Sequence, residues 1–306
     1  MNKMKKIGVL ITMVFGGLLF FAPQAQAQQD AGYTQYMFNS LVHNPAYAGS
    51  RGIISTNALY RNQWVDIEGA PESITFQIHS PLRESNSAVG LWLENDEIGA
   101  HASTRIFATY AYHLPLGSGK LSLGLQGGLR NWRSNFSQIQ GAENDPLLQE
   151  EINTWAPNVG VGAYYYTKMF YLGVGAPHIL SNKLNESGTY EEETHIYATT
   201  GLVLPLGRSV KFKPTAQLKW VTDAPAELDL TAHFLLREVL WLGVALRTFD
   251  SVDFLIEYQF TNQLRAGYAY DLPTSDIREH TSGSHELMLG YDFCFNKSRI
   301  VTPRYF

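Results

Sequence analysis

Hydrophobic and polar residues alternate along most of the chain with a period of two. In residues 252–260 the even positions are all apolar or aromatic, whereas the odd positions include Asp253, Glu257 and Gln259. Residues 264–272 and 287–295 show the same alternation. A period of two is typical of β-strands with one apolar and one polar face. The pattern therefore predicts an all-β protein.

Fourteen segments of the chain carry this alternation. Each is about as long as a tilted strand needs to be to cross a bilayer. An even number of strands is also what a single-chain bacterial outer-membrane barrel has, and it places both ends of the barrel on the periplasmic side. The predicted strands are residues 51–61, 71–80, 87–95, 102–114, 119–131, 156–167, 168–177, 192–205, 209–221, 226–237, 239–249, 251–261, 263–272 and 284–295.

The connections between these segments alternate in length. Outer loops are expected at residues 62–70, 95–101, 131–155, 177–191 and 273–283, and shorter links such as 167–168, 237–238 and 261–262 lie between them. Long outer loops and short periplasmic turns are typical of outer-membrane barrels. A secreted β-sandwich also alternates, but its polar faces meet water, and these strands carry few charged residues. We therefore predict an antiparallel transmembrane outer-membrane β-barrel of about 14 strands.

The first 27 residues have the features of a signal peptide. Lys3, Lys5 and Lys6 precede an apolar run at residues 7–21, which is followed by Ala-Gln-Ala at 25–27. The run is shorter than the roughly 20 residues of a membrane-spanning helix. We expect a signal peptide at 1–27, a short N-terminal periplasmic segment at 28–50 that plugs or docks, and the barrel at 51–306, exported to the outer membrane. Cys294 is the only cysteine, so neither a lipid anchor near residue 28 nor an internal disulfide is expected.

The charge of the chain argues against nucleic acid as a partner. Removing three lysines and no acidic residue with the signal peptide takes the formal net charge from −5 to about −8, whereas phosphate binding needs a basic face.

If the apolar face of each strand meets lipid, the other face lines the lumen and carries many charges. A ligand or ion path would use such charges, but a network of paired charges that fills a modest lumen is the interpretation we favour. The side chains expected to point inward are Arg61, Glu94, Arg105, Lys211, Lys213, Lys219, Asp229, Arg237, Arg247, Asp253, Glu257, Arg265, Asp271, Glu286 and Asp292.

The sequence offers no catalytic residue, no cofactor site and no metal site. A G-x-S-x-G elbow is absent, and residues 117–120 are only a fragment of a phosphate-binding loop without a following helix. His280 and His285 lie in or beside an outer loop, where solvated histidines are the commoner case. The acidic loop residues at 143–151 and 191–193 also fit solvated surface better than a calcium loop. We predict that the chain is not an enzyme, although a barrel-borne hydrolase stays open as a third alternative.

Residues 35–50, QYMFNSLVHNPAYAGS, precede the first strand and fit neither period cleanly. Tyr36, Met37, Phe38 and Leu41 are expected to form one short helical turn with an apolar face, which Asn44-Pro45 would end. Such a turn would plug or cap the mouth of the barrel. The alternative is a docking surface for a periplasmic partner.

Several motifs in the chain resemble one known family. They are Tyr-Met-Phe-Asn at 36–39, Asn-Pro-Ala-Tyr-Ala-Gly at 44–49, Tyr-Arg-Asn-Gln-Trp at 60–64, Gly-Ala-Pro at 69–71 and Pro-Arg-Tyr-Phe at 303–306. In these motifs the chain resembles the PorP/SprF membrane proteins of the type IX secretion system of Bacteroidetes.

The resemblance implies an outer-membrane barrel without enzymatic activity. It also implies partners, namely type IX components and secreted cell-surface cargo such as a large adhesin, whose export and surface attachment the barrel would assist, with a link to gliding motility. A porin-like or hydrophobic-solute transport barrel is the alternative function. The residues of the motifs that are candidates for partner binding or for shaping the barrel mouth are Tyr36, Phe38, Asn39, Asn44, Pro45, Tyr47, Arg61, Gln63 and Trp64. We expect Trp64 to join the interfacial aromatic girdle.

Overall fold

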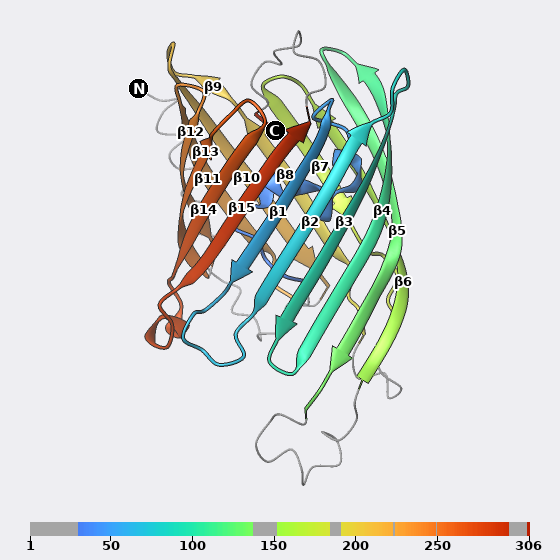
Figure 1. The fold of residues 1–306 in the computed structure, drawn as a ribbon, viewed down its shortest axis with the longest axis vertical. Coiled ribbons are helices and arrows are strands. Elements are labelled where there is room, and N and C mark those ends of the chain that lie inside the picture. The colour runs from blue at the N-terminus through green and yellow to red at the C-terminus, as the bar shows by residue number, and fades with distance from the viewer. Residues whose placement is uncertain (1–29, 137–151, 184–190, 223, 249, 294–304) are drawn as a thin grey trace, which may run out of the picture.

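In the computed structural model, one antiparallel sheet closes on itself to form a barrel (Figure 1). The structure describes residues 30–136, 152–183, 191–222, 224–248, 250–293 and 305–306. With one exception, each strand pairs with its neighbours in the chain, and the pairing of the first strand with the last closes the barrel. The strands are β1 (Ile54–Asn62), β2 (Glu72–Pro81), β3 (Ser87–Ile98), β4 (His101–Leu116), β5 (Gly119–Ser134), β6 (Ile152–Tyr166), β7 (Phe170–Ala176), β8 (His195–Leu202), β9 (Leu204–Pro205), β10 (Val210–Val221), β11 (Glu227–Leu236), β12 (Leu240–Arg247), β13 (Ser251–Gln259), β14 (Leu264–Pro273) and β15 (Ser284–Phe293).

The prediction of a barrel of about 14 strands is confirmed. β8 and the two-residue β9 both pair with β10 and are separated only by Val203, so within the described residues they act as one strand. Most boundaries fall within a few residues of the predicted ones. The first strand starts later than predicted, at Ile54, because residues 49–52 form a turn in which Gly49 and Gly52 have φ values of 72° and 68°.

Two of the predicted outer loops are shorter than expected. Residues 95–98 continue β3, and β4 starts at His101, so a tight turn with Gly99 at a φ of 55° joins the two strands. β5 and β6 likewise extend into the predicted loop 131–155, where Asn131 pairs with Trp155 across the two strands. The sequence did not predict these extensions because the strand ends are polar. The alternation of apolar residues stops before the pairing of the backbone does.

The apolar face of the strands points outward, as expected for a membrane barrel. In β13, Phe254 and Ile256 are 50% and 44% exposed, whereas the flanking Asp253 and Glu257 are 1% and 5% exposed. A soluble β-sandwich would bury the apolar face instead. This pattern excludes the sandwich and gives the barrel a lipid-facing surface with a charged lumen.

The barrel has a loop end and a turn end. Among the described residues, the loop end carries 63–71, 135–136, 177–183, 191–194 and 274–283, and the turn end carries the short links 82–86, 117–118, 167–169, 206–209, 237–239 and 260–263. The 3-10 helix η6 (Asp276–Glu279) lies in the last of the loops. Arg237, which was expected to line the lumen, lies exposed in a turn-end link with a φ of 51°.

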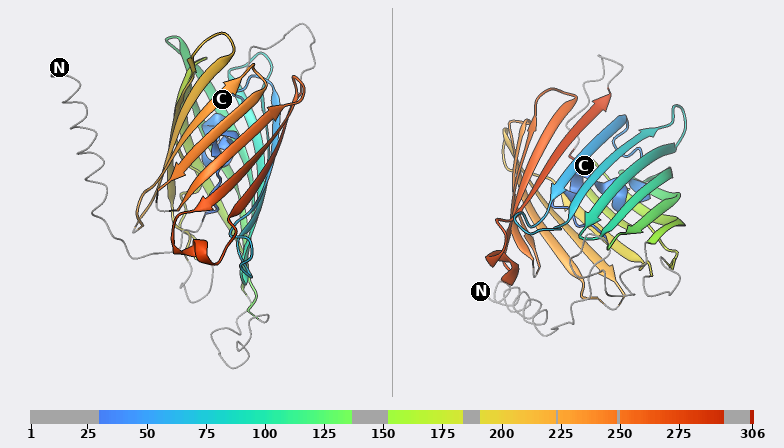
Figure 2. Two further views of the ribbon diagram at one scale, coloured as in Figure 1. Left: turned by 90° about the vertical axis from the view of Figure 1, so that its left-hand side faces the viewer. Right: turned by 60° about the horizontal axis from the view of Figure 1, so that its bottom comes forward.

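The N-terminal segment lies inside the barrel. Both views in Figure 2 show its short helices surrounded by strands. They are η2 (Tyr36–Phe38), α2 (Ser40–His43) and η3 (Pro45–Tyr47). We expected this segment at the mouth of the barrel, whereas residues 30–50 run through the lumen from Asp30 near the loop end to Gly49 near the turn end.

Some predictions fall outside the described residues. These are the signal peptide at 1–27, the acidic loop at 143–151 and Cys294. In the part of the chain that the structure describes, no helix has the length and apolar character needed to cross a membrane.

Candidate functional site inside the barrel

The N-terminal segment, residues 30–50, folds into three short helical turns because its sequence breaks every longer helix. Asn44 has an extended backbone, and its side-chain oxygen accepts a hydrogen bond from the Ala46 amide at 2.9 Å. Pro45 follows at the first position of η3, where a helix tolerates a missing N–H group. The Asn44-Pro45 pair therefore ends α2, as predicted, and starts a new turn.

Apolar side chains of the segment pack against the inner wall. Leu41, Ala46 and Tyr47 are at most 3% exposed and form one cluster with wall residues that include Trp92 and Tyr164. The Tyr47 ring meets the Tyr164 ring edge-on, with 5.6 Å between the centroids. The helical segment and the wall residues that it contacts thus form a hydrophobic core inside the barrel.

Glycines in the wall make room for this close packing. A Cβ atom at Gly124 in β5 would overlap the backbone of Pro45 and Ala46, and one at Gly175 in β7 would overlap the carbonyl of His43. Glycine permits such an approach because it has no side chain. The wall is therefore shaped to fit residues 43–46.

Wall side chains also bind the backbone of the segment. Glu286 accepts hydrogen bonds from the amides of Thr34 and Gln35 at 2.9 and 2.7 Å. The Phe38 carbonyl accepts hydrogen bonds from the side-chain amides of Asn57 and Gln77 at 2.5 and 2.7 Å. These contacts satisfy backbone groups that a buried, irregular segment would otherwise leave unpaired.

Most of the lumen charges pair with one another, in line with the favoured interpretation. Arg61 lies 2.7 Å from Asp271 and 3.1 Å from Glu286, and all three are buried. Arg247 and Arg265 make similar pairs with acids on neighbouring strands. The described lumen is therefore a network of paired charges and not a row of free ones.

The motif residues divide into two groups by position. One group lies in the lumen and the other at the loop end. In the lumen, Asn39 accepts a weak hydrogen bond from Thr75 at 3.4 Å, and the Phe38 ring lies 5.5 Å from the ammonium of Lys213. The residues in the lumen are Tyr36, Phe38, Asn39, Asn44, Pro45, Tyr47 and Arg61, and those at the loop end are Gln63 and Trp64.

Gln63 and Trp64 line a cavity of about 560 Å³ at the loop end, next to residues 30–32. Trp64 has a φ of 51°, unusual for a bulky residue, and its amide donates to the Ser284 hydroxyl at 3.1 Å. We expected Trp64 in the outer aromatic girdle, but this backbone turn places it against the cavity. Trp132 lies in the same lining.

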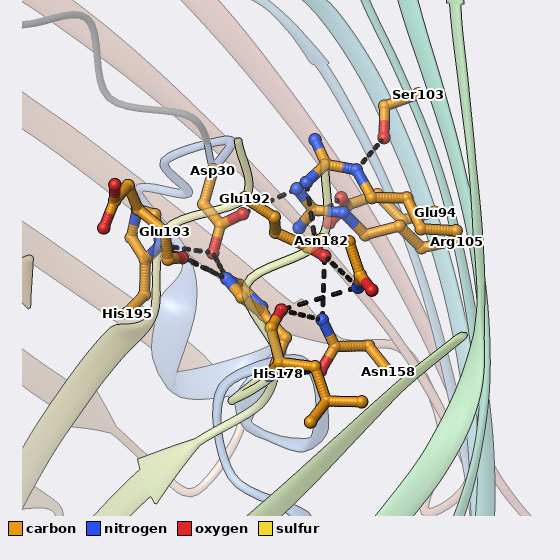
Figure 3. A network of polar contacts seen from close by, with 12 residues as sticks. Asp30, Glu94, Ser103, Arg105, Asn158, His178, Asn182, Glu192, Glu193 and His195 are labelled. Carbon is orange, nitrogen blue, oxygen red and sulfur yellow. Dashed lines mark hydrogen bonds and ion pairs between the residues drawn. The ribbon is translucent and has the colours of Figure 1, made fainter. Parts of the chain in front are cut away.

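A second polar network lies beside this cavity, around Asp30 (Figure 3). Arg105 donates to Asp30 at 2.6 Å and lies 3.2 Å from Glu94. Burial alone would raise the pKa of Asp30, but Arg105 and other nearby positive groups outweigh it and hold the pKa well below its usual value. Asp30 is therefore ionised in the folded protein.

The loop residue Glu192 belongs to the same network and is not solvated, contrary to our expectation for residues 191–193. Its carboxylate lies 3.1 Å from Arg130 and accepts hydrogen bonds from Asn158 and Asn182 at 2.8 and 3.0 Å (Figure 3). Burial would raise the pKa of Glu192, but Arg130 and the hydrogen bonds lower it overall. Glu191 and Glu193 are exposed, as predicted.

The sequence did not reveal that Asp30, His178 and His195 come together. Asp30 lies 3.5 Å from a ring nitrogen of each histidine. Asp30 belongs to the N-terminal segment, His178 to a loop and His195 to the start of β8. Because they are far apart in the sequence, no local spacing predicts that they meet. His280 and His285, the pair considered from sequence, lie elsewhere, and His285 shares a hydrogen bond of 2.6 Å with Tyr268.

Comparison with a solved channel supports the fold. The chain is similar to the CymD monoaromatic hydrocarbon channel, with a TM-score of 0.53 and 10% identity over 84% of this chain and 93% of that one. It also matches the outer membrane protein Omp33 of Acinetobacter baumannii, with a TM-score of 0.48 and 10% identity over 79% of this chain and 98% of that one. No curated protein matches the chain.

Fold and site together define a β-barrel of the outer-membrane type whose own N-terminal segment lies in its lumen. The family model of the type IX secretion system membrane protein PorP/SprF matches residues 25–291. The chain belongs to this family, and the resemblance seen in its motifs is confirmed.

Proposed function

We propose that this barrel has no enzymatic activity and assists the export and surface attachment of a partner protein, such as a large adhesin, with a role in gliding motility. Membership of a type IX secretion family supports an association with components of that system. The observation that carries the proposal is the packing of residues 30–50 in the lumen, because a filled lumen suits a docking platform better than a conduit.

The loop end is the face that we propose for partner binding. Gln63 and Trp64 line its cavity, and Trp is among the residues that contribute most to protein interfaces. The motif residues from Tyr36 to Tyr47 have a different role in this proposal, since they are packed against the wall and hold the segment in place.

Affinity purification from the native outer membrane in mild detergent tests the proposal. We expect a secreted surface protein or a type IX component to co-purify in near-equal amount with the wild-type barrel. Replacing Trp64 by Ala should weaken partner binding about 30-fold or more and so reduce the partner's recovery, because truncating a central interface residue costs about 2 kcal/mol or more. The matched control is Trp220→Ala, a tryptophan on the lipid-facing side of β10 that is 46% exposed.

Recovery of the barrel without any stoichiometric partner would contradict the proposal. Equal loss of partner from the Trp64 and Trp220 variants would contradict the loop end as the binding face. Heat-modifiable migration in gels should confirm that both variants are folded before their partners are compared.

A second candidate function is transport of a hydrophobic solute. The cavity of about 560 Å³ favours it, because the lining includes Ile98, Trp64 and Trp132 and the volume is that of a small-molecule site. Solute uptake into liposomes separates the two functions, since transport requires uptake through the wild-type barrel and partner docking does not.

A further inference from the structure

Three buried side chains direct one atom each toward a common point near the loop end (Figure 3). Asp30 Oδ2 lies 3.5 Å from His178 Nε2 and 3.5 Å from His195 Nδ1. The two ring nitrogens are 3.2 Å apart. The side chains are at most 8% exposed, which separates them from the solvated histidines of the loops.

These separations match those around a tetrahedral metal ion. With bonds of about 2.0–2.1 Å to nitrogen and oxygen, the ligand atoms of a tetrahedral zinc ion lie about 3.3 Å from one another. The backbone carbonyl of Glu193 lies 3.0 Å from both ring nitrogens, close enough to supply a fourth ligand. Two nitrogens and two oxygens thus surround one point.

Hydrogen bonding alone does not satisfy this arrangement. A nitrogen of a neutral imidazole offers either one proton or one lone pair. His178 Nε2 and His195 Nδ1 each have three polar neighbours, namely the other ring, the Asp30 carboxylate and the Glu193 carbonyl. A cation at the centre would take a lone pair from all four atoms at once.

The surroundings prepare these groups for coordination. Arg105 donates to Oδ1 of Asp30, and the Tyr197 hydroxyl donates to Oδ2 at 3.2 Å. These hydrogen bonds fix the orientation of the carboxylate, as hydrogen bonds to metal ligands usually do.

We propose that Asp30, His178 and His195 bind a divalent transition-metal ion, with the Glu193 carbonyl completing the site. Zinc suits it best, because zinc accepts imidazole and carboxylate ligands in tetrahedral geometry. The ion joins the N-terminal segment to the loop 177–194 and to the start of β8. It therefore fastens the segment at the loop end of the lumen.

Metal titration of the purified full-length chain in detergent tests the site, with a purification tag that contains no histidine. The wild type should bind one zinc ion per chain after treatment with a chelator, and cobalt(II) should give the strong visible absorption of a tetrahedral site. The double variant His178→Gln/His195→Gln should weaken zinc binding by more than about 100-fold. Loss of a group that only orients a metal ligand costs at most about 100-fold, and the loss of two ligands should cost more. His285→Gln is the matched control and should bind zinc as the wild type does.

Two results would overturn the proposal. One is a wild-type chain that takes up no zinc and gives no tetrahedral cobalt spectrum, a measurement that depends on no variant. The other is a folded double variant that binds zinc as tightly as the His285 control does. A zinc-dependent rise in the thermal unfolding midpoint of the wild type, absent from the double variant, would support the fastening role.

Discussion

Glu286 illustrates how single residues tie the N-terminal segment to the wall. Its two carboxylate oxygens accept hydrogen bonds from the amides of Thr34 and Gln35, and Arg61 supplies the opposing charge at 3.1 Å. A buried carboxylate is costly unless it is paired and hydrogen-bonded. The segment and the wall therefore stabilise each other, because removing either leaves buried polar groups of the other without partners.

Gly124 provides a direct test of the fit between segment and wall. Replacing it by Ala should lower the free energy of unfolding by about 1–3 kcal/mol, because the added Cβ overlaps the backbone of Pro45 and Ala46. Urea unfolding of the refolded barrel in detergent measures the change.

Gly127, on the same strand, is the matched control for this substitution. A Cβ atom there meets nothing within 4 Å. Gly127→Ala should leave the unfolding midpoint nearly unchanged, and an equal shift in the two variants would show that the wall does not depend on close contact with the segment.

The polar residues that meet at Asp30 show the limit of sequence reasoning at this scale. The motif from Tyr36 to Tyr47 was recognised because its residues are adjacent in the chain. Asp30 and His195 are brought together only by the path of the segment through the lumen, and neither lies in a motif. Contacts set by tertiary structure leave no trace in local spacing.

The three helical turns of the N-terminal segment depend on the barrel for their existence. Isolated helices shorter than about 12–15 residues are marginal in water, and α2 has only four residues. The pocket between this segment and the wall near Tyr36 and His43 has a volume of about 10 Å³, roughly the room of one water molecule. Close packing against the wall holds these turns together.

This packing makes the segment sensitive to acid through His43. Burial is the main cause that lowers the pKa of His43 to about 4. The charge of Asp30 raises this pKa, and Lys219 and His195 lower it further. The folded state disfavours the proton, so His43 contributes stability that is present above its unfolded pKa of about 6.5 and is lost as the pH falls toward 4. The loss amounts to about 3 kcal/mol at this one site.

The urea midpoint of the wild type should therefore fall between pH 7 and pH 4. The urea midpoint of the His43→Gln variant should fall less over this range, because glutamine does not titrate. This holds even if the variant is less stable than the wild type at pH 7. An identical pH dependence of the two proteins would contradict a role of His43 in acid sensitivity.

The strands were predictable and the position of the segment was not, for a physical reason. A strand with one face in lipid must alternate between apolar and polar residues, so β13 can be predicted from the sequence. The apolar side of Tyr36, Phe38 and Leu41 requires burial, but the mouth of a barrel and its interior both provide it. Only the wall glycines, such as Gly124 and Gly175, distinguish the two positions, and their meaning depends on knowing which strands are neighbours.

The whole molecule is a barrel that is occupied along its length in the part that the structure describes. Residues 30–50 occupy the lumen from the loop end to the turn end, where the Phe306 ring packs 4.7 Å from the ring of Tyr171. The backbone carbonyl of Phe306 also accepts a hydrogen bond from Arg51 at 3.2 Å. Residues 30–50 and the C-terminal Phe306 thus both contribute to the interior, and the cavity lined by Trp64 opens at the loop end.

This arrangement accounts for a charged lumen without an ion path. Arg61, Arg105 and Arg247 each face at least one carboxylate on the wall or on the segment. Paired charges of this kind hold the structure together and leave little free charge to attract a permeating ion.

The measurement that tests the central claim most directly is the ionic conductance of the wild-type barrel in planar bilayers, with a known porin as the positive control. A barrel whose lumen holds residues 30–50 should insert without adding a steady current. Stable, ohmic open-channel steps from the folded wild-type chain would contradict the account, because they require a water-filled path where the structure places the segment.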